Sequence, residues 1–284
     1  MPVEERGLGS RQTQDVGKDR RLGNLSAPSS VQRLQKALHA KAKAEPDFRF
    51  YALYDKIYRE DILAHAYAQC RSNKGAPGVD GQDFADVEAF GRERWVGELA
   101  LALGEETDRP DPIRRVCIPK ANGPLRPLGI STLRGRVCLT AALLVLEPIV
   151  EADLPPEQDA YRPGRNAQQA VVEVEEVLFR SHPDVVDADL SDYFGSIPHA
   201  ELLKSVARRV VDRRVLHLIK QWLECPVEEI DGRGRSGGPR WPKTAAAASR
   251  RVPPSHPCWR ICTCAGLCWH GSSGGWSGVL AAGS

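Results

Sequence analysis

The chain has 284 residues, of which 42% are hydrophobic and 27% are charged, enough to bury one large core or two modest ones. Its longest apolar run, around Ala141–Val150, covers about ten residues and is too short to span a bilayer, so we expect no membrane partner. The first residues contain no apolar stretch of the kind that signal peptides have. We therefore expect a bacterial-type cytoplasmic protein.

The formal charge of +2 is spread unevenly along the chain. Residues 236–284 contain five Lys or Arg and no Asp or Glu, so residues 1–235 carry 34 basic and 37 acidic side chains, a net charge of −3. Any nucleic-acid role therefore depends on a local basic surface. Residues 236–284 also contain four of the eight cysteines, and the other four are scattered singly, which indicates a reduced protein rather than a disulfide scaffold.

The first third of the chain predicts three helices after a disordered segment. Residues 1–30 are polar and have almost no apolar periodicity. A basic amphipathic helix follows over Val31–Lys43, and a second has its apolar side between Leu53 and Leu63. The turn-rich segment Ser72–Gly81 ends the second helix, and a third runs through Trp95 to Leu103.

From residue 113 the pattern changes to that of a β-hairpin, and an α+β or α/β fold follows from the mixture of helices and a few strands. Asn166 is the expected N-cap of one later helix. The expected elements are a hairpin with strands in Arg115–Lys120 and Leu125–Ile130, a short strand at Asp184–Leu190, and helices at Arg136–Ala152, Asn166–Arg180, His199–Val211 and Val215–Glu224.

Three clusters of residues have side chains that suit a binding or catalytic role. The carboxylates of Asp187, Asp189 and Asp192 at the end of a buried strand suit Mg²⁺, although a solvated turn has the same composition. Three basic residues that we expect to cluster around the hairpin turn (Arg114, Lys120 and Arg126) and two at the Pro-Gly turn (Arg162 and Arg165) suit phosphate groups. Read alone, each basic cluster is also compatible with an ordinary solvated surface.

Taken together, six blocks resemble group II intron reverse transcriptase/maturases in order and spacing, over about residues 50–235. The blocks are Lys74–Gly81, Arg115–Lys120, Arg126–Ile130, Leu146–Ile149, Tyr161–Arg165 and Val186–Leu190 with Ile197–His199. This resemblance implies a right-hand polymerase fold, here the fingers and a partial palm, and an RNA-directed DNA polymerase that uses an RNA template, a DNA primer, dNTPs and two Mg²⁺.

The resemblance also implies a role for each matching residue. Asp189 is the expected catalytic residue and metal ligand, with the backbone carbonyl of Leu190 as a second metal ligand. The dNTP would be held by Arg114, Lys120, Arg126 and Phe194. The template would be contacted by Lys74, Tyr161, Arg162 and Arg165. We expect four regions: a disordered segment (1–30), a helical extension with the template-side loop (31–110), fingers and partial palm (111–235) and a tail (236–284).

The sequence departs from the family after Asp192. No Tyr-Ala-Asp-Asp block supplies the second metal-binding carboxylate, and Gly135 and Gly195 stand where the family usually has Asp. Codons can be chosen for Ser236–His270 that encode, in a shifted frame, a peptide with the missing Pro-Gln-Gly and Ser-Pro-Leu-Leu-Ala-Asn segments. We therefore expect residues 236–284 to be an out-of-frame, disordered translation and the polypeptide to be inactive as a polymerase.

Other interpretations stay open at this point. Cys258, Cys262, Cys264, Cys268 and His270 have the residue types of a zinc site, but not the usual paired C-x2-C spacing. The chain would also suit a non-catalytic fragment that binds intron RNA, or a reverse transcriptase of the retron or diversity-generating type. The sequence does not define an oligomeric state.

Overall fold

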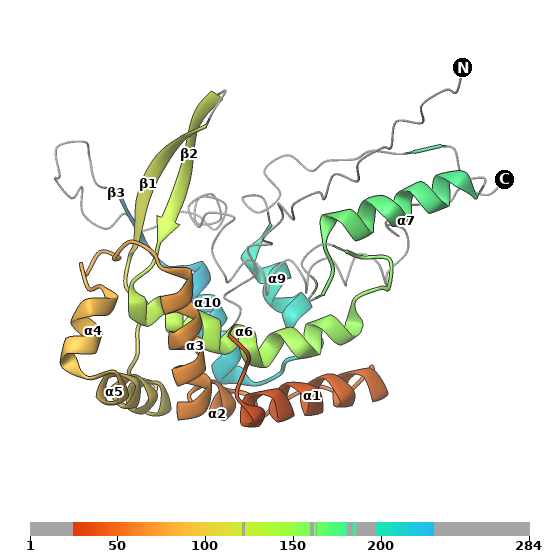
Figure 1. The fold of residues 1–284 in the computed structure, drawn as a ribbon. Coiled ribbons are helices and arrows are strands. Elements are labelled where there is room, and N and C mark those ends of the chain that lie inside the picture. Colours follow the sequence, from red (N-terminus) through yellow and green to blue (C-terminus); the bar gives the residue numbers. More distant parts are fainter. Residues whose placement is uncertain are drawn as a thin grey trace, which may run out of the picture.

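The computed structural model describes residues 25–120, 123–159, 162, 164–180, 184–185 and 197–229, with only the backbone in the strands at 118–120 and 123–127 and at residue 229. It has a helical body from which one β-hairpin rises (Figure 1). No helix in these described ranges is long and apolar enough to cross a membrane. The expectation of an α+β fold is confirmed: many helices accompany one small sheet.

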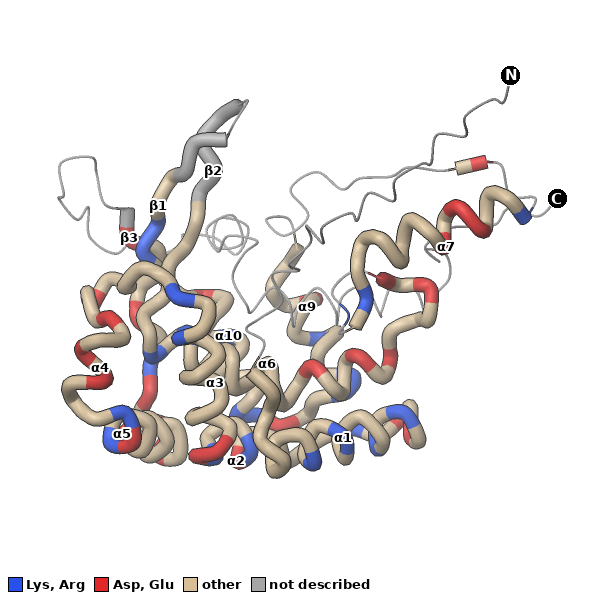
Figure 2. Tube along the Cα trace, in the orientation of Figure 1, with Lys and Arg blue, Asp and Glu red and all other residues tan. Residues whose placement is uncertain are grey.

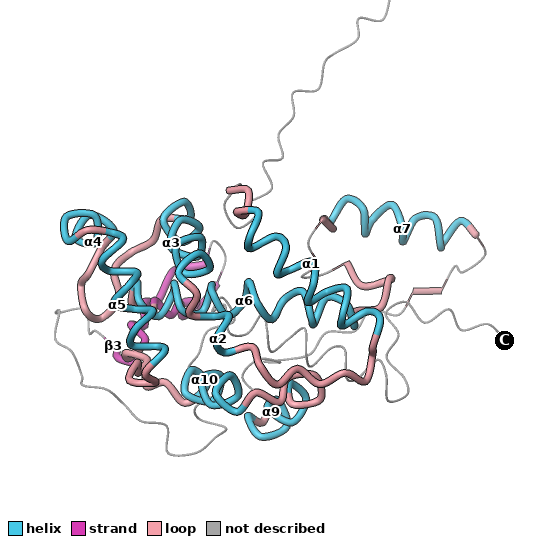
Figure 3. Tube along the Cα trace, turned by 90° about the horizontal axis from the view of Figure 1, so that it is seen from below, coloured by secondary structure: helices cyan, strands magenta, loops and turns pink. Residues whose placement is uncertain are grey.

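The core is built around α6 (Leu133–Asp153), which buries thirteen of its 21 residues. A helix that is apolar on nearly all sides must be covered on all sides. α1 (Ser29–Ala44) and α3 (Glu60–Asn73) pack against it, and Figure 3 shows α1 beside α6 from below. The buried apolar cluster is continuous from Val31 to Val227, so the helical extension and the fingers region share one core.

The sequence predicts most of the helices correctly. The basic helix expected at Val31–Lys43 is α1, and the third expected helix is α5 (Arg92–Gly104). Asn166 caps α7 (Ala167–Phe179) through a capping box with Gln169, as expected. The helix expected at Val215–Glu224 is α10 (Arg213–Leu223).

Several element boundaries were wrong. The expected second helix is two helices, α2 (Tyr54–Ile57) and α3, because Arg59 between them has extended backbone angles. The helix expected at His199–Val211 ends early as α9 (His199–Val206), because the backbone of Val210 pairs with Phe50 in an isolated bridge. α4 (Phe84–Phe90) was not expected, and α1 begins inside the segment expected to be disordered.

The sheet has the strand order β2-β1-β3. β1 (Ile113–Lys120) and β2 (Gly123–Ile130) form the expected antiparallel hairpin, with a bulge near its tip. The sequence did not predict β3 (Val227–Glu229), which pairs in parallel with the start of β1. The strand expected at Asp184–Leu190 and the tail at 236–284 lie largely or wholly outside the described residues.

α7 differs from the other helices because it buries none of its residues. It extends away from the helical body in Figure 1, and its side chains include Val171 at 65% exposure and Phe179 at 92%. Figure 2 shows acidic residues along α7, whereas basic residues mark α1. The two helices therefore present surfaces of opposite charge.

Candidate nucleic-acid interface

The hairpin separates basic residues that the sequence seemed to gather at one turn. Arg114 pairs in register with Ile130 at the base of the hairpin, whereas Lys120 pairs with Gly123 beside the turn. At about 3.3 Å per residue, the two Cα atoms lie roughly 20 Å apart along the strand. The expectation that Arg114, Lys120 and Arg126 cluster around the turn was therefore wrong for Arg114, although its dNTP role stays a prediction.

Arg114 instead contacts the glycine-rich loop at residues 74–81, which we call the template-side loop. Its Nη1 donates a hydrogen bond to the carbonyl oxygen of Pro77 at 3.3 Å. One residue earlier, the carbonyl of Ala76 accepts a bond of 2.8 Å from Nη2 of Arg136, in the first turn of α6. Two arginines from two different elements thus hold two consecutive carbonyls of this loop.

The loop also fits closely against the N-cap of α6. A Cβ atom added to Gly78 would lie 2.6 Å from the Cα atom of Thr132, so only glycine fits there without displacement. Thr132 in turn caps α6 by accepting a hydrogen bond from the backbone of Gly135 at 3.2 Å. The loop is therefore packed onto the junction between β2 and α6.

The charged groups at the loop are two arginines and the carboxylate of Asp80. Within the described residues, no carboxylate lies within ion-pair distance of the guanidinium of Arg114 or Arg136. Burial lowers the pKa of Arg136, and burial together with nearby Asp111 raises the pKa of Asp80 in the loop. Lys74 adds an exposed positive charge where the loop begins. Sequence reasoning assigned no role to Arg136, yet a basic residue in the first turn of a helix is a signal that could have identified it.

The two arginines of the Pro-Gly turn are used within the protein. Arg162 donates to the carboxylate of Glu151 at 2.9 and 3.1 Å and to the carbonyl of Pro155 at 2.9 Å, and its side chain is only 15% exposed. Arg165 lies 3.4 Å from Asp159 and 3.7 Å from Glu173. These contacts brace the turn between α6 and α7, and the template role of both arginines stays a prediction.

The outer face of α1 carries exposed basic side chains. Arg33 and Lys36 are exposed on the side opposite the buried residues Val31, Leu38 and Ala42. Figure 2 shows the basic residues spaced along this helix. Such a stripe suits a polyanion, and a solvated helix surface has the same appearance.

The expected catalytic centre lies outside the described residues. The residues outside the described part of the chain include Tyr161, Asp189, Leu190 and Phe194. Elsewhere, among the residues whose side chains are described, no group of three His, Cys, Asp or Glu side chains could hold a metal ion. The Mg²⁺ site therefore stays a prediction from the resemblance.

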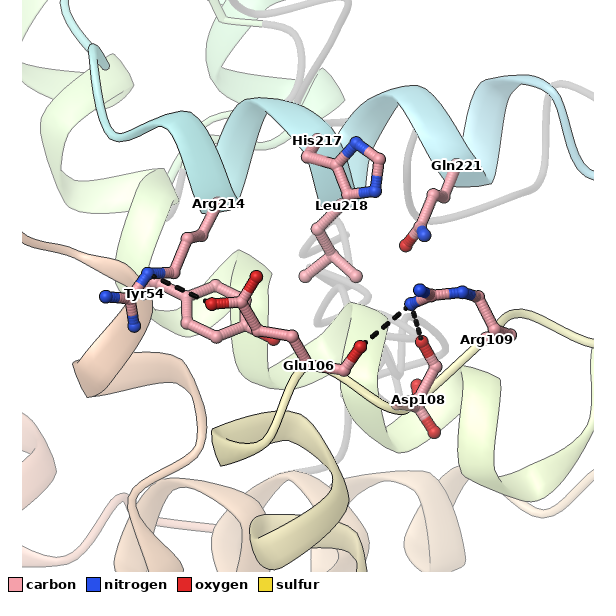
Figure 4. Close-up of a pocket in the computed structure, with 8 residues that line it drawn as sticks. All are labelled: Tyr54, Glu106, Asp108, Arg109, Arg214, His217, Leu218 and Gln221. Carbon is pink, nitrogen blue, oxygen red and sulfur yellow. Dashed lines mark hydrogen bonds and ion pairs between the residues drawn. The ribbon is translucent and has the colours of Figure 1, made fainter.

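A small polar hollow between α10 and the turn after α5 is unsuited to a nucleotide. Its volume is about 20 Å³, room for one water molecule. Figure 4 shows its two arginines already paired: Arg214 lies 3.3 Å from the carboxylate of Glu106, and Arg109 donates to the carbonyl oxygens of Glu106 and Asp108. These contacts join α10 to α5.

Asp212, one of two aspartates after Asp192, has a structural role. Its side chain is buried and accepts hydrogen bonds from the backbone amides of Leu53 at 2.8 Å, Tyr54 at 2.9 Å and Arg214 at 3.0 Å. It therefore caps α10 and joins it to the start of α2. With its lone pairs directed at amides, Asp212 does not replace the missing catalytic carboxylate.

Comparison with known proteins identifies the family. Residues 118–244 match the family described as "Reverse transcriptase (RNA-dependent DNA polymerase)". Group II intron-encoded protein LtrA of Lactococcus lactis is 29% identical over 177 residues, which cover 62% of this chain and 29% of LtrA. The reverse transcriptase match and the relatives named as group II intron proteins and maturases support the group II intron reverse transcriptase/maturase family for this chain. The reverse transcriptase match begins in β1 and continues eight residues beyond Ser236, where the composition changes.

The chain covers only part of the length of its relatives. Protein YkfC of Escherichia coli is 35% identical over 210 residues, which cover 71% of this chain and 54% of YkfC. The chain therefore spans about half of YkfC and less than a third of LtrA. A solved structure, a partial Cas6-RT-Cas1–Cas2 complex, aligns with 69% of this chain and 33% of its own at 20% identity and a TM-score of 0.37.

Proposed function

We propose that the protein is the fingers and partial palm of an RNA-directed DNA polymerase of the group II intron type, with the bacterial cytoplasm as its compartment. Its substrates would be a primer on an RNA template and dNTPs. The observation that carries this proposal is the reverse transcriptase match, which begins in the hairpin. The template-side loop supports it, because two arginines without ion-pair partners among the described residues lie beside that loop.

The residue roles follow the resemblance. The incoming dNTP would be contacted by Arg114, Lys120, Arg126 and Phe194, and the template by Lys74, Tyr161, Arg162 and Arg165. Asp189, with the carbonyl of Leu190, would hold Mg²⁺. When bound, Mg²⁺ supplies charge neutralisation at the reacting phosphate.

The 284-residue polypeptide is expected not to extend primers, because one carboxylate cannot hold two metal ions. The test is primer extension by the purified chain on a poly(rA)–oligo(dT) duplex with Mg²⁺, with a complete group II intron reverse transcriptase as positive control. No extended product is expected. Template-dependent extension that disappears in Asp189→Asn would refute the expected inactivity.

The nucleotide sequence separately tests the out-of-frame tail. The shifted frame after the codon for Arg235 is expected to encode the Pro-Gln-Gly block. A gene in which no alternative frame encodes that block would refute this explanation of residues 236–284.

The second candidate, a non-catalytic RNA-binding fragment, is favoured by the exposed basic face of α1. Filter binding to a structured RNA should then weaken steeply with salt, because each neutralised phosphate releases counterions. The double variant Arg33→Gln/Lys36→Gln should lower the salt slope by about 1.4–1.8, since each phosphate contact contributes roughly 0.7–0.9. Lys204→Gln is the matched control, because Lys204 is exposed but paired with Glu201 at 2.8 Å. Equal slopes for all three proteins would refute an α1 contact.

A further inference from the structure

The template-side loop begins with a residue in a strained backbone conformation. Lys74 adopts a φ of 55°, in the left-handed region that residues other than glycine rarely adopt. Gly75 and Gly81 have φ values of 149° and 71°. A conformation of this kind persists only where surrounding structure holds it. The contacts that hold the loop therefore decide its shape.

Those contacts come from both sides of the loop. Arg136 donates to the carbonyl of Ala76 from α6, and Arg114 donates to the carbonyl of Pro77 from β1. Arg136 lies so close that a Cβ atom on Gly75 would be 2.4 Å from its Nη1. A side chain at position 75 would therefore displace the guanidinium of Arg136 from its present place, and the φ of 149° at Gly75 is itself strained for any other residue.

The position of Arg136 is unfavourable for α6 by itself. A positive charge in the first turn opposes the helix dipole. Its Nε is buried without a hydrogen-bond acceptor, and burial lowers the pKa of its guanidinium. Cys70 and Asp80 raise the pKa of Arg136 and so oppose the effect of burial. The ring centroid of Phe84 lies 6.0 Å from the guanidinium carbon. The hydrogen bond that Arg136 donates to the carbonyl of Ala76 is the specific interaction gained by placing an arginine at this position.

We propose that Arg136 is a positioning residue that latches the template-side loop onto the base of the hairpin, with Arg114 as the second latch. Nucleic acid then meets the loop and the hairpin as one preformed surface. The latch acts through geometry rather than through the charge of Arg136. This inference rests on the proposed nucleic-acid binding, but the state of the loop can be measured without any nucleic acid.

Limited proteolysis measures the loop directly. Trypsin cleaves after lysine, opening of the loop is expected to speed cleavage after Lys74, and mass spectrometry identifies the new N-terminus at Gly75. Cleavage at this bond should accelerate about tenfold in both Arg136→Gln and Arg136→Lys, as expected for the loss of one hydrogen bond to a charged group. Arg134→Gln is the matched control, because Arg134 lies in the same helical turn but pairs with Asp108. Lys74→Gln confirms the cleavage site, and circular dichroism confirms that every variant is folded.

Binding to the poly(rA)–oligo(dT) duplex then separates geometry from charge. Both Arg136 variants should weaken binding, and Arg136→Lys should do so with an unchanged salt slope, because its charge is retained. The proposed latch is refuted if trypsin cleaves after Lys74 no faster in both Arg136 variants than in the unmodified protein. It is also refuted if the unmodified protein is cleaved there rapidly. An opened loop with unchanged binding would overturn the positioning role. A further outcome is that the unmodified protein fails to bind the duplex while the proteolysis result is as expected. That outcome would refute the proposed function and with it the positioning role. It would leave the latch between Arg136 and the loop supported.

Discussion

Replacing Asp212 by alanine should destabilise the protein far more than the loss of an ordinary helix cap. The substitution removes the N-cap acceptor of α10 and also the shared acceptor of the Leu53 and Tyr54 amides. Loss of an N-cap costs about 0.5–2 kcal/mol, and each buried amide left without a partner costs about 1–3 kcal/mol. The total is roughly 2.5–8 kcal/mol, a large part of the 5–15 kcal/mol by which domains are typically stable.

Urea unfolding followed by far-UV circular dichroism gives the free energy of unfolding for this comparison. Asp83→Ala is the control, because Asp83 caps α4 at the surface by accepting from the amides of Ala85 at 2.7 Å and Asp86 at 3.0 Å. Its loss should cost about 1 kcal/mol. Equal losses for Asp212→Ala and Asp83→Ala would refute the reasoning that the buried α2 amides depend on Asp212.

Three further predictions follow from buried contacts. Arg209→Met should lower the free energy of unfolding by about 3–5 kcal/mol in urea denaturation, because it removes a guanidinium that lies 2.8 Å from both Asp153 and the carbonyl of Ala42; a loss below about 1 kcal/mol would contradict this. Gly78→Ala should cost about 1–3 kcal/mol through overpacking against Thr132 and should speed tryptic cleavage after Lys74; unchanged stability would contradict the close contact. Burial lowers the pKa values of His65 and His199, so the unfolded chain takes up protons first and stability should fall as the pH drops below about 6.5. Urea midpoints at pH 7.5 and 5.5 test this, and the variant His65→Gln/His199→Gln should show a smaller difference between them.

Local signals predicted the elements that depend on local interactions. Asn166 and Gln169 lie three residues apart and form their capping box within one turn, so the start of α7 was readable from the sequence. The apolar run of α6 likewise predicted a buried helix, although Thr132 starts it three residues earlier than expected. In both cases the sequence near the element contains the interaction that defines it.

Elements defined by distant partners were missed or misplaced. β3 is three residues long and exists because Val227 pairs with Ile113, more than a hundred positions earlier. α9 stops early because the amide of Val211 donates to the carbonyl of Phe50 at 2.8 Å, a contact that no periodicity reveals. Pairing between residues distant in sequence overrides local helix propensity in such segments.

The candidate site was predicted by residue type better than by arrangement. The basic residues of the hairpin were identified, but the strand register that separates Arg114 from Lys120 was not. Arg162 was predicted as a template contact, which stays a prediction, but its ion pair with Glu151 was not foreseen. An arginine on a turn looks the same in a sequence whether a phosphate or a carboxylate of the same protein is its partner.

The exposed apolar side chains of α7 have a consequence for the fate of the protein in the cell. A helix of this length without a fully buried side chain gains little packing energy and is only marginally stable. Its valines and Phe179 offer the kind of surface that chaperones and degradative proteases select. The turnover of the polypeptide is therefore expected to begin at α7, long before the well-packed body around α6 unfolds.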